Sequence, residues 1–134
     1  MAPKIHHITL TVSNVEQSSR WYQELLGDAL VVEGEGPGWK RRLMMWPSGL
    51  VIGVTEYDAA PATSSFSHTN LGLDHVSLAC ASEAEVGQWF EKLETLGFSH
   101  GPLEDAPYGS TVTARDPDNI PLEFFCSKSS ARVN

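Results

Sequence analysis

Two stretches of the chain carry the same alternation of polar and apolar positions. Residues 5–12 read Ile-His-His-Ile-Thr-Leu-Thr-Val, and residues 73–80 read Leu-Asp-His-Val-Ser-Leu-Ala-Cys. Successive side chains of a β-strand point to opposite faces, so each stretch predicts a strand with one apolar and one more polar face. His7 and His75 take the same place on the polar faces, whereas His6 is expected on the opposite face from His7.

A helical pattern follows each of these strands. A Ser with a Glu three residues later has the spacing of a capping box, which predicts a helix start. The two pairs are Ser13–Glu16 and Ser82–Glu85. Apolar residues at helical spacing come next, and Gly27 and Gly97 stand where a C-cap glycine ends a helix.

The rest of each half predicts three more strands. In the first half they cover residues 29–33, 40–46 and 50–55, with a Gly-rich loop at 34–38 and a turn at 47–49. In the second half a short strand begins at Phe98, and two more cover 110–115 and 120–126, with a loop at 103–109 and a turn at 116–119.

The two halves form an internal repeat. Trp21 and Trp89 each follow their histidine by 14 residues. The pattern predicts an α+β fold of two tandem βαβββ modules whose sheets curl around a shared cavity. We expect one domain of 134 residues, made of module one (about 4–56), a linker (57–70), module two (about 71–126) and a polar tail (127–134).

Composition narrows the possible partners. The formal net charge is -8, which argues against nucleic acid because phosphate binding needs clustered Lys and Arg. No apolar run approaches the roughly 20 residues of a membrane helix, and the N-terminus leads straight into a strand, so we expect a cytoplasmic protein without a signal peptide. Cys80 and Cys126 lack the spacing of a disulfide framework.

The last predicted strand supplies a third candidate for a site. Glu123 lies between Leu122 and Phe124, where a carboxylate is costly unless it is paired or bound to a cation. Together with His7 and His75 it makes a set of two histidines and one carboxylate. That set suits a divalent transition metal and leaves coordination positions open for substrate or water.

These residues resemble the vicinal oxygen chelate superfamily, which includes glyoxalase I, extradiol dioxygenases, fosfomycin-modifying enzymes and bleomycin-binding proteins. The resemblance rests on the spacing of His7, His75 and Glu123, on Trp21-Tyr22 near a helix end, and on the ending Asp116-Pro117-Asp118 … Leu122-Glu123-Phe124. It implies a small-molecule substrate, a homodimer, and metal ligands on the first and last strands of each module.

The ligand set implied by the resemblance departs from the four-ligand pattern of glyoxalase I. Aligning Pro47 with Pro117 places Gly53 opposite Glu123, and glycine has no side chain to bind a metal. Glu56 lies three residues further on and would project to the other face unless a bulge intervened. The three ligands His7, His75 and Glu123 match the pattern of extradiol dioxygenases and of fosfomycin-modifying enzymes, and a three-ligand site favours Fe(II) or Mn(II), with Zn(II) or Ni(II) as alternatives.

The leading hypothesis is therefore a metal-dependent, extradiol-dioxygenase-like enzyme with a 2-His-1-Glu site. A glyoxalase-like lyase or isomerase, with Glu123 as the acid-base group, is the first alternative. A metal-free drug-binding protein of the bleomycin-resistance type is the second. Tyr108 and His68 are further catalytic candidates, and Arg41 and Arg115 serve either in salt bridges or in binding a substrate carboxylate.

Overall fold

The computed structural model describes residues 1–60 and 64–128. The chain divides into two compact units, Met1–Ser64 and Ser65–Asn134, and their boundary falls inside the predicted linker. The predicted tail beyond Lys128 lies outside the described residues, as do residues 61–63 of the linker. No helix among the described residues has the length and apolar character needed to cross a membrane.

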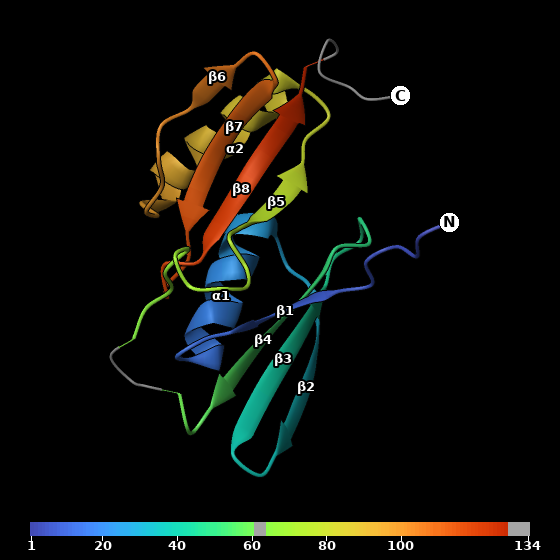
Figure 1. The fold of residues 1–134 in the computed structure, drawn as a ribbon, viewed down its shortest axis with the longest axis vertical. Coiled ribbons are helices and arrows are strands. Elements are labelled where there is room, and N and C mark those ends of the chain that lie inside the picture. Colours follow the sequence, from blue (N-terminus) through green and yellow to red (C-terminus); the bar gives the residue numbers. More distant parts are fainter. Residues whose placement is uncertain (61–63, 129–134) are drawn as a thin grey trace. The chain divides into compact units, whose positions relative to one another are not determined.

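The first unit is a four-stranded sheet with one helix. Its elements are β1 (Ile8–Thr11), α1 (Val15–Leu26), β2 (Leu30–Gly36), β3 (Trp39–Met45) and β4 (Val51–Tyr57). The strands lie in the order β1-β4-β3-β2 (Figure 1). β1 runs parallel to β4, and the other neighbouring strands are antiparallel.

The second unit repeats this arrangement. Its elements are β5 (Val76–Ala79), α2 (Glu83–Leu96), β6 (Glu104–Ala106), β7 (Gly109–Arg115) and β8 (Pro121–Ser127). The strand order is β5-β8-β7-β6, again with a parallel pair between the first and last strands. The two units confirm the predicted α+β class and the two βαβββ modules.

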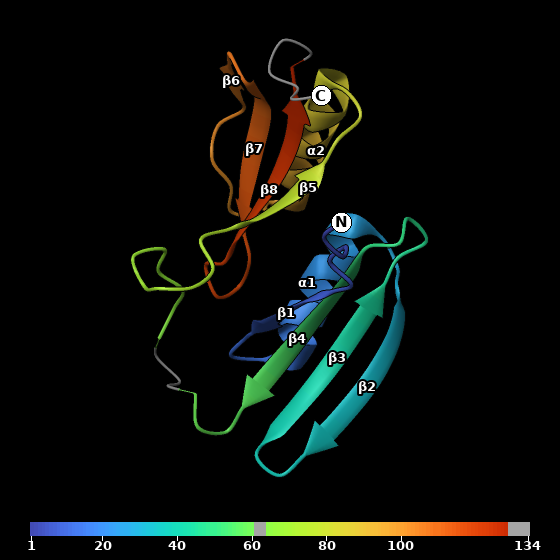
Figure 2. The ribbon, with the colours of Figure 1, turned by 45° about the vertical axis from the view of Figure 1, so that its right-hand side comes forward.

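Each helix covers one face of its own sheet and makes a core there. In the first unit the fully buried side chains include Tyr22 and Leu25 of α1 and Met44, Ile52 and Val54 of the sheet. In the second unit α2 lies along β7 and β8 (Figure 2), and the buried side chains there include Val86, Leu93, Val112, Leu122 and Phe124. The opposite face of each sheet has no helix of its own unit, and we call it the open face.

The alternation of side chains follows the prediction. In β1 and just beyond it, Leu10 and Val12 are buried while Thr9 and Thr11 are exposed. In β8, Leu122 and Phe124 are buried and Glu123 between them is half-buried. Thr9, Thr11 and Glu123 are therefore placed on the open faces.

The first helix begins one residue later than the capping box predicts. Asn14, not Ser13, is the N-cap, and its Oδ1 accepts the backbone N–H of Gln17 at 2.8 Å. Asn is at least as good an N-cap as Ser. The second helix begins as predicted, because the Ser82 hydroxyl accepts the N–H of Glu85. Gly27 and Gly97 are the C-caps, both at positive φ.

Two predicted loops contain more strand than expected. β2 extends through the Gly-rich segment to Gly36, paired with Trp39 of β3. β6 lies inside the predicted loop 103–109 and pairs with β7. The strand expected from Phe98 is only a single bridge between His100 and Ala114. In β2 and β6 the hairpin hydrogen bonds to a neighbouring strand outweigh the local turn preference.

Candidate metal site

His75 and Glu123 come together on the open face of the second sheet. β5 and β8 run parallel with Ser77 opposite Glu123, so these two side chains share a face, and His75 immediately precedes β5. The His75 Nε2 lies 3.9 Å from the Glu123 Oε1. Two of the three predicted metal ligands are thus brought together by the register of one strand pair.

Both side chains are oriented by a second polar group. The His75 Nδ1 lies 2.6 Å from the Asp74 Oδ1, and the Ser77 hydroxyl donates to the Glu123 Oε1 at 2.8 Å. The hydrogen bond from His75 lowers the pKa of Asp74, with smaller contributions from the charges of His75 and His68. A carboxylate on Nδ1 fixes the tautomer that leaves Nε2 as the acceptor facing Glu123.

His7, the third predicted ligand, belongs to the first unit. It immediately precedes β1 and is exposed. Its Nδ1 lies 2.8 Å from the His6 Nδ1, and the two rings meet edge to face. The expectation that His6 points away from His7 is therefore wrong, because β1 begins at Ile8 and strand alternation does not extend to these two residues. As in His75, the Nδ1 of His7 is engaged by the preceding residue.

The first module has glycine where the second has its acid. Gly53 pairs with Thr9 as Glu123 pairs with Ser77, so the alignment inferred from the two prolines holds in the strand register. A Cβ at Gly53 would lie 3.0 Å from the Thr9 Oγ1 and 3.3 Å from the Leu43 Cδ1. The space of a fourth ligand is thus already filled by neighbouring side chains.

Glu56 does not replace that missing acid. It pairs regularly with Lys40, without a bulge, so it projects to the helix-covered face as predicted. There its Oε1 accepts the backbone N–H of Val15 at 3.0 Å, the first amide of α1, and its Oε2 lies 3.6 Å from the Lys40 Nζ. Glu56 stabilises the start of α1.

The two other catalytic candidates take different places in the second unit. His68 is exposed and near enough to Asp74 to affect its pKa. Tyr108 lies between β6 and β7, and its ring stacks on Phe125 at a centroid distance of 6.3 Å. Phe125 is opposite Ala79, at the far end of β5 from His75. His68 thus lies toward Asp74 and His75, and Tyr108 contacts Phe125, which follows Glu123 by two positions on the same face of β8.

The geometry of His75 and Glu123 fits a divalent metal ion. Two ligand atoms bound at about 2.1 Å to one ion stand about 3 to 4 Å apart, and the observed separation is 3.9 Å. The Asp74 contact is the outer carboxylate partner that metal-bound histidines usually have. Within either unit, no three described His, Cys, Asp or Glu side chains form such a group, so this pair is a partial site that needs a further ligand.

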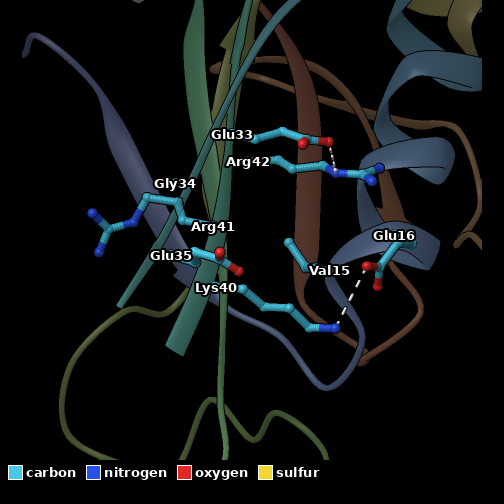
Figure 3. Close-up of a pocket in the computed structure, with 8 residues that line it drawn as sticks. All are labelled: Val15, Glu16, Glu33, Gly34, Glu35, Lys40, Arg41 and Arg42. Atoms are coloured by element: carbon cyan, nitrogen blue, oxygen red, sulfur yellow. Dashed lines mark hydrogen bonds and ion pairs between the residues drawn. The ribbon is translucent and has the colours of Figure 1, made fainter. Parts of the chain in front are cut away.

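Hollows also open on the surface of the described residues. One, of about 350 Å³, opens between α1 and strands β2 and β3 (Figure 3). In its lining Lys40 pairs with Glu16 and Glu56, and Arg42 pairs with Glu33. The two carboxylates raise the pKa of Lys40. The two cations of this hollow that face α1, Lys40 and Arg42, are thus already neutralised and give no reason to assign a ligand there.

Another hollow, of about 270 Å³, lies along β7. Its lining includes Thr113 and Arg115, and Thr113 is the direct partner of Glu123 across the strand pair. Arg115 donates to the backbone carbonyl of Asn119 at 3.5 Å. The rest of its lining, which includes Gly101, Pro102 and Glu104, lies on the side of β7 away from β8, and neither His75 nor Glu123 lines it.

Asp74 and Ser77 are the site residues that sequence reasoning missed. Asp74 directly precedes His75, and Ser77 occupies the next position on the same face of the strand. Only the parallel pairing of β5 with β8 brings Ser77 next to Glu123. The signal available in the sequence was the carboxylate immediately before the histidine.

Two βαβββ modules repeated in one chain define a class of small α+β domains. Comparison with known proteins identifies the family: the family model described as "Glyoxalase/Bleomycin resistance protein/Dioxygenase superfamily" matches residues 4–124. The chain belongs to this superfamily, as its sequence resemblance implies.

Three relatives illustrate the likeness. A lactoylglutathione lyase of Haemophilus influenzae is 28% identical over 140 residues, covering 95% of both chains. A glyoxylase/bleomycin resistance protein/dioxygenase domain from Frankia sp. EAN1pec is 32% identical, with a TM-score of 0.87 over 96% of this chain and 95% of that one. The fosfomycin resistance protein FosX of Listeria monocytogenes, solved with Mn(II) and 1S,2S-dihydroxypropylphosphonic acid, is 20% identical with a TM-score of 0.71 over all of both chains, which shows a shared fold.

Proposed function

We propose that this protein is a divalent-metal-dependent enzyme that acts on a small molecule, with His75, Glu123 and His7 as its metal ligands. The observation that carries the proposal is the His75–Glu123 pair, 3.9 Å apart, with the Nδ1 of His75 held by Asp74. An imidazole kept in one tautomer with its free nitrogen facing a carboxylate is the arrangement that a transition metal requires.

The chain's own residues prepare this site. Asp74 orients the imidazole of His75, and Ser77 holds one oxygen of Glu123. Because Gly53 supplies no fourth ligand, more of the coordination sphere is left for the substrate. A divalent ion bound there supplies Lewis-acid stabilisation to substrate oxygens that gain negative charge. Glu123 is the acidic group best placed to accept a proton from a bound substrate.

A lyase or isomerase is the reaction type we favour. The support is the lactoylglutathione lyase of Haemophilus influenzae, whose similarity covers 95% of both chains. An extradiol-dioxygenase-like reaction is the second candidate, and Gly53 favours it because the resemblance associates three-ligand sites with those enzymes. The metals expected are Zn(II) or Ni(II) for the first reaction and Fe(II) or Mn(II) for the second.

Metal analysis of protein purified without chelators tests the proposal. We expect about one equivalent of metal per chain, lost in His75→Ala and strongly reduced in Glu123→Gln. Glu91→Gln is the matched control, because Glu91 is an exposed carboxylate on α2 in the same unit. A wild-type protein that takes up none of Fe(II), Mn(II), Ni(II) and Zn(II) would leave a metal-free binding protein as the better description.

Activity assays then separate the two reactions. The metal-loaded protein is assayed for isomerisation of the hemithioacetal of methylglyoxal and glutathione, and for ring cleavage of catechols. Activity in the first assay supports the lyase or isomerase, and activity in the second supports the dioxygenase. In either case Glu123→Gln should lose activity while the fold, followed by circular dichroism, stays intact.

A further inference from the structure

Arg41 differs from the two cations beside it on β3. Lys40 and Arg42 each pair with a carboxylate, that of Glu16 and that of Glu33. Within residues 1–60 and 64–128, Arg41 pairs with none. Figure 3 shows Arg41 pointing to the opposite side of the strand from Lys40 and Arg42. An unpaired guanidinium in a chain of net charge -8 calls for a specific explanation.

Strand register places Arg41 on the open face of the first sheet. Arg41 pairs with Thr55 of β4, and Thr55 pairs with Thr11 of β1. Directly paired residues share a face, so Arg41 lies on the same face as Thr9 and Thr11. Along β1, Thr11 is about 13 Å from the position of His7. Arg41 is thus remote from the proposed ligand His7 but belongs to the same sheet.

Two contacts hold the guanidinium of Arg41 in place. Its Nε donates to the Thr55 hydroxyl at 2.8 Å, and its Cζ lies 4.9 Å from the centroid of the Trp39 ring. The indole of Trp39 in turn lies over Gly36, where a Cβ would come within 2.7 Å of the ring atom Cε2. Gly36 leaves space for the Trp39 indole, against which the Arg41 guanidinium packs.

These contacts decide which donors remain. Thr55 occupies the Nε–H, so the two terminal amino groups are left as a parallel pair of donors. That pair binds the two oxygens of a carboxylate end-on. Nearby on the same face are apolar side chains: Tyr57 pairs with Trp39 and is 41% exposed, and Val32 pairs with Leu43 and is 50% exposed.

We propose that Arg41, braced by Thr55 and Trp39, is a binding subsite for a carboxylate carried on an apolar or aromatic body. This inference rests on the proposed function only in taking the bound molecule to be the enzyme's substrate. The subsite holds a group distant from the reacting atoms, so its contribution is to affinity and positioning rather than to the chemical step. Trp39 and Tyr57 contact the apolar body while Arg41 holds the charge.

Phenylacetate is the probe for this subsite. Binding is followed by calorimetry and by the indole N–H signal of Trp39 in nuclear magnetic resonance spectra. We expect phenylacetate to bind the wild type and Arg42→Gln alike, and to bind Arg41→Gln about tenfold more weakly or worse. Arg42→Gln is the matched control because Arg42 neighbours Arg41 but points to the opposite side of the strand and pairs with Glu33.

Three results would overturn the assignment. They are equal binding of phenylacetate by Arg41→Gln and wild type, no binding by the wild type, and tighter Arg41-dependent binding of inorganic phosphate than of phenylacetate. Metal content is measured on the same samples and should be unchanged in Arg41→Gln. If the wild-type protein bound phenylacetate but took up no metal, only the proposed function would have failed.

Discussion

Replacing Asp74 tests whether the His75–Glu123 pair binds metal as proposed. The Asp74 carboxylate holds the His75 Nδ1 at 2.6 Å, a short, charge-assisted contact. Loss of such outer partners typically weakens metal binding about 10- to 100-fold. The Asp74 side chain is 69% exposed, so water replaces part of its role, and we expect Asp74→Ala to weaken binding by about tenfold, the lower end of that range.

Asp74→Asn separates orientation from charge. Its amide oxygen still accepts the His75 Nδ1–H, so this variant should lie between Asp74→Ala and the wild type. Affinities are measured by competition of Mn(II) and Ni(II) with a fluorescent chelator. Asp105→Ala is the control, because Asp105 is 71% exposed in the same unit and pairs with Lys128 instead. Wild-type affinity in Asp74→Ala, alongside loss of binding in His75→Ala, would refute this reasoning.

Three further predictions concern the scaffold. Asn14→Ala should destabilise the protein by about 1 kcal/mol by removing the N-cap of α1, measured by urea denaturation, whereas Asn14→Ser should keep most of the stability; equal losses in both would contradict the capping role. Phe124→Ala should cost about 3 to 5 kcal/mol, because Phe124 is 1% exposed and stacks on Trp89 at 4.5 Å; a loss below about 1 kcal/mol in the same assay would show that the site collapses around the cavity. Burial raises the pKa of the Cys80 thiol to about 11. The rate of maleimide labelling of Cys80 in the Cys126→Ser variant should therefore be slow at pH 8 and rise about tenfold per pH unit below that pKa. A labelling rate that does not change with pH would contradict the shift.

The fold and part of the site were predictable because they depend on local patterns. Alternation in the strands that carry Leu10 and Phe124 assigns their faces, since a strand has a period of two. The repeat also fixes that Gly53 corresponds to Glu123, and the strand registers bear this out. These features require only the sequence pattern and the regular geometry of a β-ladder.

The remaining features depend on contacts between strands, which the local sequence pattern does not predict. The extension of β2 through Gly36 follows from its pairing with Trp39 of β3. The hydrogen bond from Ser77 to Glu123 exists only because two strands 46 residues apart run in register. The engagement of Arg41 by Thr55 is likewise a cross-strand contact. Each is decided by tertiary pairing, which local propensity does not report.

The parallel pairing of first and last strands has a consequence for folding. Ile8 pairs with Ile52 and Val76 with Leu122, so each module must close a loop of roughly 45 residues before its sheet is complete. The entropic costs of these two closures differ by only about 0.04 kcal/mol. Chain topology therefore favours faster folding of neither module. Any difference in their folding rates must come from how well each helix packs onto its own sheet.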